Sequence, residues 1–144
     1  MRHRLYCHLI WTTRDRLPLI DAATATFLER YLRSVASRLG ADIMEIGMVQ
    51  THVHILARVP PAMSIPVLVQ GLKGGSATVA NREVRTGGSG KLTWAEGYSA
   101  SSVSEITLDR VRRYVRRQTE HHPHEAIPGY RHSSALDSTS RGLG

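Results

Sequence analysis

The fold is decided by the stretch His52-Val53-His54-Ile55-Leu56-Ala57-Arg58-Val59, in which two sets of side chains alternate. Successive side chains of a β-strand point to opposite faces of the sheet. One face of this run is apolar, with Val53, Ile55, Ala57 and Val59, and the other carries His52, His54, Leu56 and Arg58. A sheet with helices on one side only would produce this division. The pattern therefore predicts a strand at 52–59 whose histidines lie on the face away from the main helical layer.

Further strands and helices are predicted on both sides of this run. Alternating residues predict strands at about 4–13 and 42–49, and shorter strands at 91–94 and 98–104. Helical spacing predicts three helices: one that Asp21 caps and that runs to Leu39, one over 65–83 that Ser64 caps, and one from the cap Thr107 to His122.

The last of these helices would pack through Leu108, Val111 and Val115, which recur at helical spacing. Residues 1–122 are expected to form one domain, because no composition shift or long linker divides them. The polar residues 123–144 are expected to form a flexible tail.

The composition favours a polyanionic partner. The 144 residues carry a net charge of +7, and five arginines stand against one acid between Asp109 and Gln118. Such a segment suits nucleic acid, although a solvated helix face is an equally good interpretation. The single cysteine, Cys7, cannot form an internal disulfide, and neither a signal peptide nor an apolar run of the roughly 20 residues that span a bilayer is found. A cytoplasmic protein is therefore expected.

His52 and His54 are candidate metal ligands. Residues i and i+2 of a strand share a face, with Cα atoms about 6.5–7 Å apart, so two imidazoles can converge on one ion. An H-x-H pattern alone is better explained as a half-exposed strand that carries two histidines without a catalytic purpose. Burial does not force their placement, however, because the opposite face is uniformly apolar, and this favours a metal site. The other histidines lack comparable spacing: His3, His8, His121, His122, His124 and His132.

A third ligand and a nucleophile are candidates on the basic helix. Residues four apart stack on one helix face, so Tyr114 and Gln118 point the same way, with Arg110 and Arg117 beside them. A phenol among guanidinium groups suits attack on a phosphodiester, whereas Tyr114 taken alone is better explained as an amphipathic residue between helix and sheet. Two imidazoles, an amide oxygen and open positions would suit Mg²⁺ or Mn²⁺ rather than a closed zinc site.

Five motifs together resemble one family. They are His8-Leu9-Ile10-Trp11, His52-Val53-His54-Ile55-Leu56, Leu72-Lys73-Gly74-x-Ser76, Trp94-x-Glu96-Gly97-Tyr98 and Tyr114-x-x-x-Gln118. Their order and spacing, over roughly residues 5–122, are similar to those of the single-tyrosine HUH transposases of small bacterial insertion sequences, of which REP-associated tyrosine transposases are near relatives. An H-x-H pair alone is unspecific, whereas the five motifs together are highly specific.

The resemblance implies a fold and a reaction. The expected fold is α+β, a ferredoxin-like or RRM-like antiparallel sheet with two helices on one face and a C-terminal catalytic helix at the other. The expected protein is a homodimer that cleaves and rejoins single-stranded DNA at element ends, where it recognises hairpins. His52, His54 and Gln118 would bind Mg²⁺ or Mn²⁺, and Tyr114 would form a 5′-phosphotyrosine.

Other residues go beyond the resemblance or depart from it. Lys73 is expected to contact the DNA backbone, and Arg110, Arg113 and Arg117 to steer the strand into the site. Thr51 stands where the family commonly has an acidic residue or asparagine, which bears on imidazole orientation and rate. The alternative is a non-catalytic or degenerate protein that binds single-stranded DNA or hairpins on the same fold. The histidine strand has none of the aromatic residues of such a module, which favours the enzyme.

Overall fold

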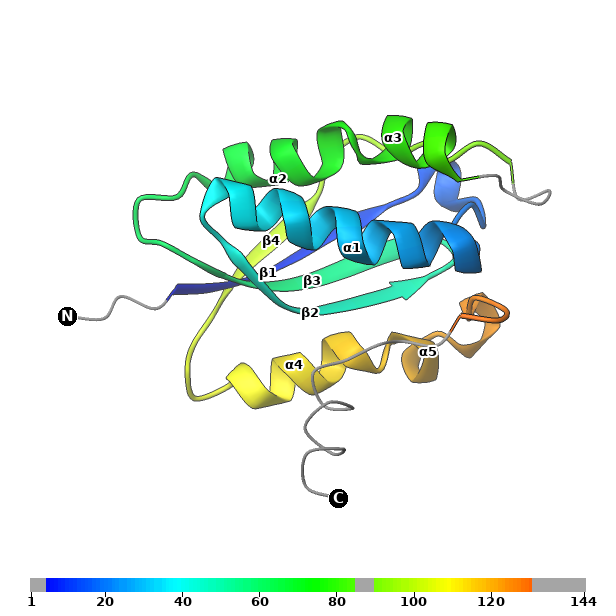
Figure 1. The fold of residues 1–144 in the computed structure, drawn as a ribbon. Helices are drawn as coiled ribbons and strands as arrows, with labels where there is room; N and C mark the ends of the chain where they lie inside the picture. Colours follow the sequence, from blue (N-terminus) through cyan, green and yellow to red (C-terminus); the bar gives the residue numbers. More distant parts are fainter. Residues whose placement is uncertain (1–4, 85–89, 131–144) are drawn as a thin grey trace, which may run out of the picture.

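The computed structural model describes residues 5–84 and 90–130 (Figure 1). The elements follow in the order β1 (Leu5–Thr12), η1 (Arg14–Arg16), α1 (Ala22–Leu39), β2 (Asp42–Val49), β3 (His52–Val59), α2 (Ile65–Gly74), α3 (Ser76–Glu83), β4 (Ser99–Val103), α4 (Leu108–Arg116), α5 (Gln118–His121) and η2 (Pro123–Glu125). Among the helices of the described residues, none is both long and apolar enough to cross a membrane.

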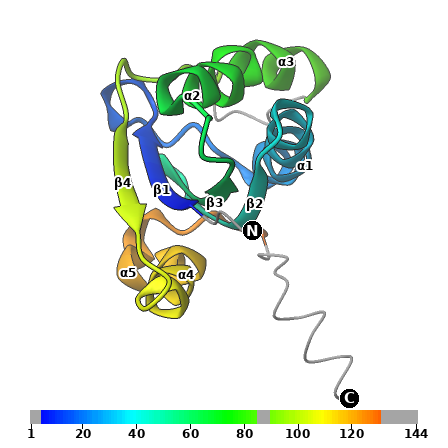
Figure 2. The ribbon, with the colours of Figure 1, turned by 90° about the vertical axis from the view of Figure 1, so that its left-hand side faces the viewer.

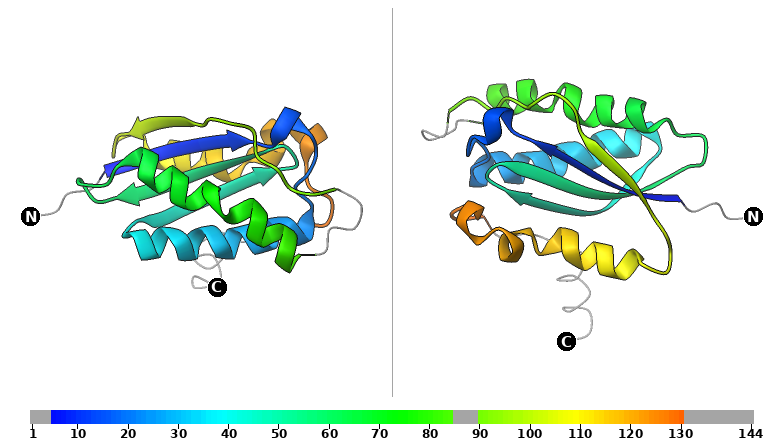
Figure 3. Two further views of the ribbon diagram at one scale, coloured as in Figure 1. Left: turned by 90° about the horizontal axis from the view of Figure 1, so that it is seen from above. Right: turned by 180° about the vertical axis from the view of Figure 1, so that it is seen from behind.

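The four strands form one antiparallel sheet in the order β2-β3-β1-β4. Helices α1, α2 and α3 cover one face of it, and α4 and α5 lie against the other, as Figures 1 and 2 show. The views from above and from behind show the same layers, with β4 at the edge of the sheet (Figure 3). The α+β fold is therefore confirmed. The predicted strand at 91–94 is reduced to an isolated bridge between Thr13 and Trp94.

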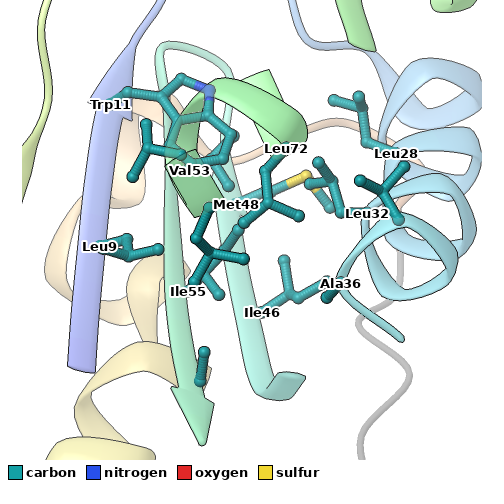
Figure 4. Packing of buried hydrophobic residues seen from close by; sticks show 14 of the residues in the cluster. Leu9, Trp11, Leu28, Leu32, Ala36, Ile46, Met48, Val53, Ile55 and Leu72 are labelled. Carbon is teal, nitrogen blue, oxygen red and sulfur yellow. The ribbon is translucent and has the colours of Figure 1, made fainter. Parts of the chain in front are cut away.

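The core lies between the sheet and α1 to α3, on the predicted apolar face of β3. Val53 and Ile55 are fully buried there beside Leu9 and Trp11 of the neighbouring β1. Side chains from α1, α2 and β2 complete the cluster in Figure 4, among them Leu28, Leu32, Ala36, Ile46, Met48 and Leu72. The opposite side of the same strand is left for His52 and His54.

Helix α1 begins and ends as its sequence predicts. The Asp21 carboxylate accepts a hydrogen bond of 2.8 Å from the Thr24 amide, which satisfies one of the free amides of the first turn. Gly40 ends the helix with a φ of 93°, a left-handed conformation that glycine adopts without steric cost.

The helix predicted over 65–83 is in fact two helices, separated at Gly75. The Ser76 hydroxyl donates a hydrogen bond of 2.9 Å to the Lys73 carbonyl and accepts one of 2.9 Å from the Trp94 indole. A Cβ at position 75 would lie 2.9 Å from the Tyr31 hydroxyl. A side-chain bond to the backbone and close packing thus interrupt the helix, and neither is visible in residue periodicity.

The predicted basic helix is interrupted as well. It breaks at Arg117, whose φ and ψ of −98° and 34° separate α4 from α5. The Thr107 side chain does not cap α4, because its hydroxyl lies 3.0 Å from the Ser104 hydroxyl and bonds within that turn instead. The packing stripe is also narrower than predicted, since Val115 is buried but Leu108 and Val111 are only partly so.

The described part of the predicted tail is folded onto the domain. Ile127 is 6% exposed and belongs to the core, and the Tyr130 hydroxyl donates to Glu29 at 2.7 Å. The Gln50 amide donates to the Glu125 carbonyl at 2.8 Å. Residues after the expected boundary at 122 therefore pack against the domain as far as Tyr130. Residues 131–144 of the predicted tail lie outside the described residues.

One buried carboxylate attaches α4 to the sheet. The Glu45 side chain on β2 is 0% exposed, and Arg112 and Arg116 donate to its Oε1 at 3.3 and 3.4 Å. Arg112 also donates to the Met44 carbonyl at 3.4 Å. Burial of an unpaired carboxylate is unfavourable in free energy, so α4 packs on the sheet with the face that carries both arginines.

We expect Glu45→Ala to lower the free energy of unfolding by about 3 kcal/mol, because it leaves two partly buried guanidinium groups without their partner. Asp42→Ala on the same strand is the matched control: it removes an exposed pair with Arg58 and should cost less than about 1 kcal/mol. Urea denaturation measures both. Equal, small losses would contradict Glu45 as the anchor of α4.

Candidate active site

The two histidines of β3 lie beneath α4 and α5. His52 and His54 are 3% and 4% exposed, and their ring centroids are 5.0 Å apart. The strand pattern predicts the shared face, and the helices add the burial, since α4 contacts both β2 and β3. Both histidines are therefore buried. A half-exposed strand, the plainer explanation of the H-x-H pattern, would have left them partly in contact with solvent.

Tyr114 and Gln118 reach the same place from α4 and α5. The Tyr114 ring centroid lies 5.8 Å from that of His54, and its side chain is 40% exposed. Gln118 is 1% exposed, and its Nε2 donates to the Tyr114 carbonyl at 2.9 Å. Its buried Oε1 has no hydrogen-bond partner of normal geometry among the described residues. The Gln118 amide is nevertheless close enough to His52 to act on the pKa of that imidazole, which it raises.

Gly47 of β2 allows this close approach. A Cβ at this position would lie 1.8 Å from the Val115 carbonyl oxygen and 2.9 Å from Cγ of Gln118. The first contact is with backbone, which cannot move aside without moving α4. The absence of a side chain at position 47 therefore sets how closely Gln118 can approach the histidines.

Three histidines that the sequence interpretation set aside surround this pair. Nε2 of His8 lies 2.9 Å from Nδ1 of His54. The His122 ring centroid is 4.8 Å from that of His52, and the His121 ring centroid is 4.6 Å from that of Tyr114. Their spacing in the sequence did not indicate that these three residues would lie next to the pair. A signal was present for His122, which stands four residues after Gln118, but β1–β3 pairing had to be known to place His8.

Thr51 and Glu125 continue the cluster behind His52. The Thr51 hydroxyl lies 3.0 Å from Nδ1 of His52 and donates a short hydrogen bond to Oε1 of Glu125. Oε2 of the same carboxylate lies 3.4 Å from Nδ1 of His122. Glu125 belongs to the segment expected to be a tail, so sequence reasoning missed it.

Burial lowers the pKa of His8, His52 and His54 and so favours their neutral form at neutral pH. Desolvation, followed by repulsion from His52 and His8, lowers the pKa of His54 to about 3. Desolvation and then the neighbouring His122 lower the pKa of His52, while burial alone lowers that of His8. The bond from Thr51 is the largest influence on Glu125 and lowers its pKa, so the carboxyl is ionised. Neutral imidazoles are the form that binds metals.

His52, His54 and Gln118 supply atoms of kinds that bind divalent cations. Among the described residues, no group of three or more His, Cys, Asp and Glu side chains is arranged to hold a metal. His52, His54 and the buried Oε1 of Gln118, which has no hydrogen bond of normal geometry among the described residues, form a set of another kind, two neutral nitrogens and an amide oxygen. Such a set leaves coordination positions for water and substrate oxygens.

The basic residues divide between two roles. Arg112 and Arg116 face Glu45, whereas Arg110, Arg113 and Arg117 are exposed. Lys73 is not brought to the histidines: it lies on α2, across the sheet from α4 (Figures 1 and 2). Its ammonium donates to the carbonyls of Ala95 and Gly97 at 2.6 and 2.9 Å and so holds that segment in place.

The chain is similar to known transposases. The family model described as "Transposase IS200 like" matches residues 1–118. The ISDra2 transposase TnpA of Deinococcus radiodurans is 30% identical over 119 residues, which cover 81% of this chain and 85% of that protein.

Two solved structures are similar in fold. A candidate transposase from Deinococcus radiodurans R1 superposes with a TM-score of 0.65 at 28% identity, over 82% of this chain and 93% of that one. A REP-associated tyrosine transposase bound to a REP hairpin superposes with a TM-score of 0.69 over 100% of this chain and 86% of that one. The second is 11% identical, so the likeness concerns the fold alone.

We expect Gly47→Ala to lower the free energy of unfolding by about 2 kcal/mol, because the new methyl group overlaps the Val115 carbonyl and forces α4 away from β2. Gly74→Ala is the control, since a Cβ there meets nothing within 4 Å and should be neutral or slightly stabilising. Urea denaturation compares the two. A neutral Gly47→Ala would show that α4 is not held this close to the sheet.

Stability should fall as the pH drops below about 6.5. The pKa of His54 in the folded protein is near 3, so protons bind the unfolded chain first, and stability present above pH 6.5 is lost below it. This residue should account for about 1 kcal/mol between pH 7.5 and 5.5. Denaturation of wild type and His54→Gln at both pH values measures it. The variant should lose less, and an equal loss in both proteins would refute the assignment to His54.

Proposed function

This chain belongs to the family of IS200-like transposases, and from that premise we propose that it cleaves and rejoins single-stranded DNA with Tyr114 as the nucleophile. One observation carries the proposal. An accessible phenol lies beside two buried, neutral imidazoles and a buried amide oxygen that has no hydrogen bond of normal geometry among the described residues. A phosphate group next to Tyr114 would therefore also lie near the side chains that would hold a metal ion.

In the proposed first step, the Tyr114 oxygen attacks a phosphorus atom of the DNA backbone. The bond from oxygen to phosphorus forms as the bond from phosphorus to the 3′ oxygen breaks. The phenol loses its proton, and the departing oxygen gains one to become a 3′-hydroxyl. Attack of a 3′-hydroxyl on the phosphotyrosine reverses these changes and reseals a strand. One phosphoester replaces another at each stage, so no external energy source is needed.

His52, His54 and Gln118 would hold Mg²⁺ or Mn²⁺, which supplies Lewis-acid stabilisation of charge on a phosphoryl oxygen. The neutral imidazoles support this assignment, as does the buried Oε1 of Gln118, which has no hydrogen bond of normal geometry among the described residues. His121 packs against the Tyr114 ring and would restrict its orientation during attack. Gln118 also donates to the Tyr114 carbonyl, so one side chain joins the metal site to the nucleophile's backbone.

Charge supports DNA as the substrate. The chain has a net charge of +7, and the exposed Arg110, Arg113 and Arg117 flank Tyr114 on the same helical segment. We assign backbone-phosphate contacts to them, and to Lys73 through the third N–H of its ammonium group. The structure of the same fold that is bound to a REP hairpin supports a DNA hairpin as partner. Recognition of hairpins at the ends of an insertion sequence, by a homodimer, is part of the proposal.

We expect Tyr114→Phe to abolish a covalent protein–DNA adduct while hairpin binding stays within about twofold, because only the attacking oxygen is removed. Labelled single-stranded DNA from the flanks of the gene is incubated with protein and Mg²⁺ or Mn²⁺, and a denaturing gel is examined for the adduct. Tyr98→Phe is the matched control, since Tyr98 is 42% exposed and Tyr114 is 40% exposed.

The outcomes separate the proposal from its alternative. Adduct formation by wild type and Tyr98→Phe, but not by Tyr114→Phe or in the presence of a chelator, supports the nucleophile and the metal together. An adduct that survives Tyr114→Phe excludes Tyr114 as the nucleophile. Specific binding without an adduct under either metal would instead indicate a binding protein on this fold.

A further inference from the structure

Three groups behind the candidate metal site form a continuous chain of contacts. The Glu125 carboxylate accepts a hydrogen bond from the Thr51 hydroxyl, and the Thr51 oxygen lies 3.0 Å from Nδ1 of His52. Thr51 is 6% exposed and His52 is 3% exposed, so water does not compete freely for the contact between them, whereas the Glu125 side chain is 27% exposed.

The direction of each hydrogen bond follows from the number of protons available. An ionised carboxylate only accepts, so the single hydroxyl proton of Thr51 is given to Glu125. The Thr51 oxygen can then only accept from the ring, and Nδ1 of His52 must carry its proton. A neutral imidazole has one N–H, which leaves Nε2 with the lone pair. The chain of contacts thus selects one of the two neutral forms of His52.

Backbone contacts hold Glu125 in its position. Its carbonyl accepts from the Gln50 amide at 2.8 Å, and its amide donates to the His122 carbonyl at 3.0 Å. Ile127, two residues later, is buried in the core. The carboxylate is therefore held by backbone contacts on both sides, and it lies beyond residue 118, where the family match ends.

We propose that Glu125 is a positioning residue that acts through Thr51 to hold His52 as its Nδ1–H form, with Nε2 free to bind a cation. The inference rests on the proposed function only for the identity of that cation. The hydrogen-bond relay can be tested without any metal. Partners of this kind orient histidine ligands and make them more basic.

His54 provides an internal comparison. Its Nδ1 faces Nε2 of His8 at 2.9 Å, and either ring of such a pair can donate to the other. No carboxylate fixes the direction of that bond in the described contacts of His8 and His54. The form of His52 should therefore depend on Glu125, whereas the form of His54 should not.

The test is nuclear magnetic resonance of the full-length, metal-free protein with ¹⁵N-labelled histidine, at a pH well above 6.5. Long-range ¹H–¹⁵N correlations show which ring nitrogen carries the proton, and His52→Gln assigns the signals. Wild type and Thr51→Ser should show His52 protonated at Nδ1 alone. Glu125→Ala and Thr51→Val should show a mixture of both forms or the Nε2–H form. Glu83→Ala, an exposed glutamate on α3, is the matched control.

Titration with Mn²⁺ in the absence of DNA gives a second readout. Glu125→Ala and Thr51→Val are expected to weaken binding by about tenfold or more, and Thr51→Ser to restore it, as for other partners of metal-bound histidines. If Glu125→Ala does not fold, the Thr51→Val and Thr51→Ser pair makes the same comparison without changing the Glu125 segment.

The results distinguish the relay from the proposed function. A His52 form that changes in Glu125→Ala and Thr51→Val, in a protein that binds no Mn²⁺, would support the relay and count against the metal. A single Nδ1–H form that persists in both variants would overturn the proposal, whatever the Mn²⁺ affinity. An Nε2–H form in wild type would overturn it as well.

Discussion

The ion pair between the buried carboxylate of Glu45 and the guanidinium groups of Arg112 and Arg116 is the interaction on which the candidate site depends. The sheet leaves one face uncovered by α1 to α3, and α4 attaches there through this pair. Gly47, two residues along β2, lets the helix backbone approach until Gln118 is buried. Without both features, Tyr114 and Gln118 would have no fixed position relative to His52 and His54.

The packing of α4 on the sheet also decides the charges on the face of the sheet that carries His52 and His54. A chain with a net charge of +7 gathers five histidines on this face of the sheet. Burial lowers the pKa of the two innermost, His52 and His54, and so favours their neutral form. Arg112 and Arg116 of α4 face Glu45. Arg110 and Arg113 of the same helix, and Arg117 at its C-cap, are exposed. One short helix can therefore be anchored by an internal ion pair and still present positive charge beside Tyr114. A polyanion that approaches this surface meets guanidinium groups before it meets the neutral interior.

The site extends well past the residues that motif spacing indicates. His8, His122, Thr51 and Glu125 all touch the histidine pair or each other, and they come from β1, the end of α5, the β2–β3 turn and η2. Local pattern cannot relate them, because the contacts join residues as far apart in sequence as 51 and 125. The Glu125 segment was also obscured by composition, since prolines and polar residues there resemble a tail although Ile127 packs in the core.

The sequence by itself determined the layers of the fold and the central residues of the site. Alternation along 52–59 is a local property of a strand, and it fixed which side of β3 faces the core and which carries His52 and His54. Helical spacing predicted Tyr114 and Gln118 on one side, and the structure brings both near the histidines although the helix breaks at Arg117 between them. Only the tertiary structure decided where the helices break, how deeply the histidines are buried, and that Glu125 stands behind His52. Those features arise from contacts between distant segments, namely Ser76 with Trp94, Glu45 with two arginines, and Thr51 with Glu125. Periodicity describes one helix or strand at a time. It therefore carries no information about which distant side chain will form a hydrogen bond or an ion pair with a buried polar group.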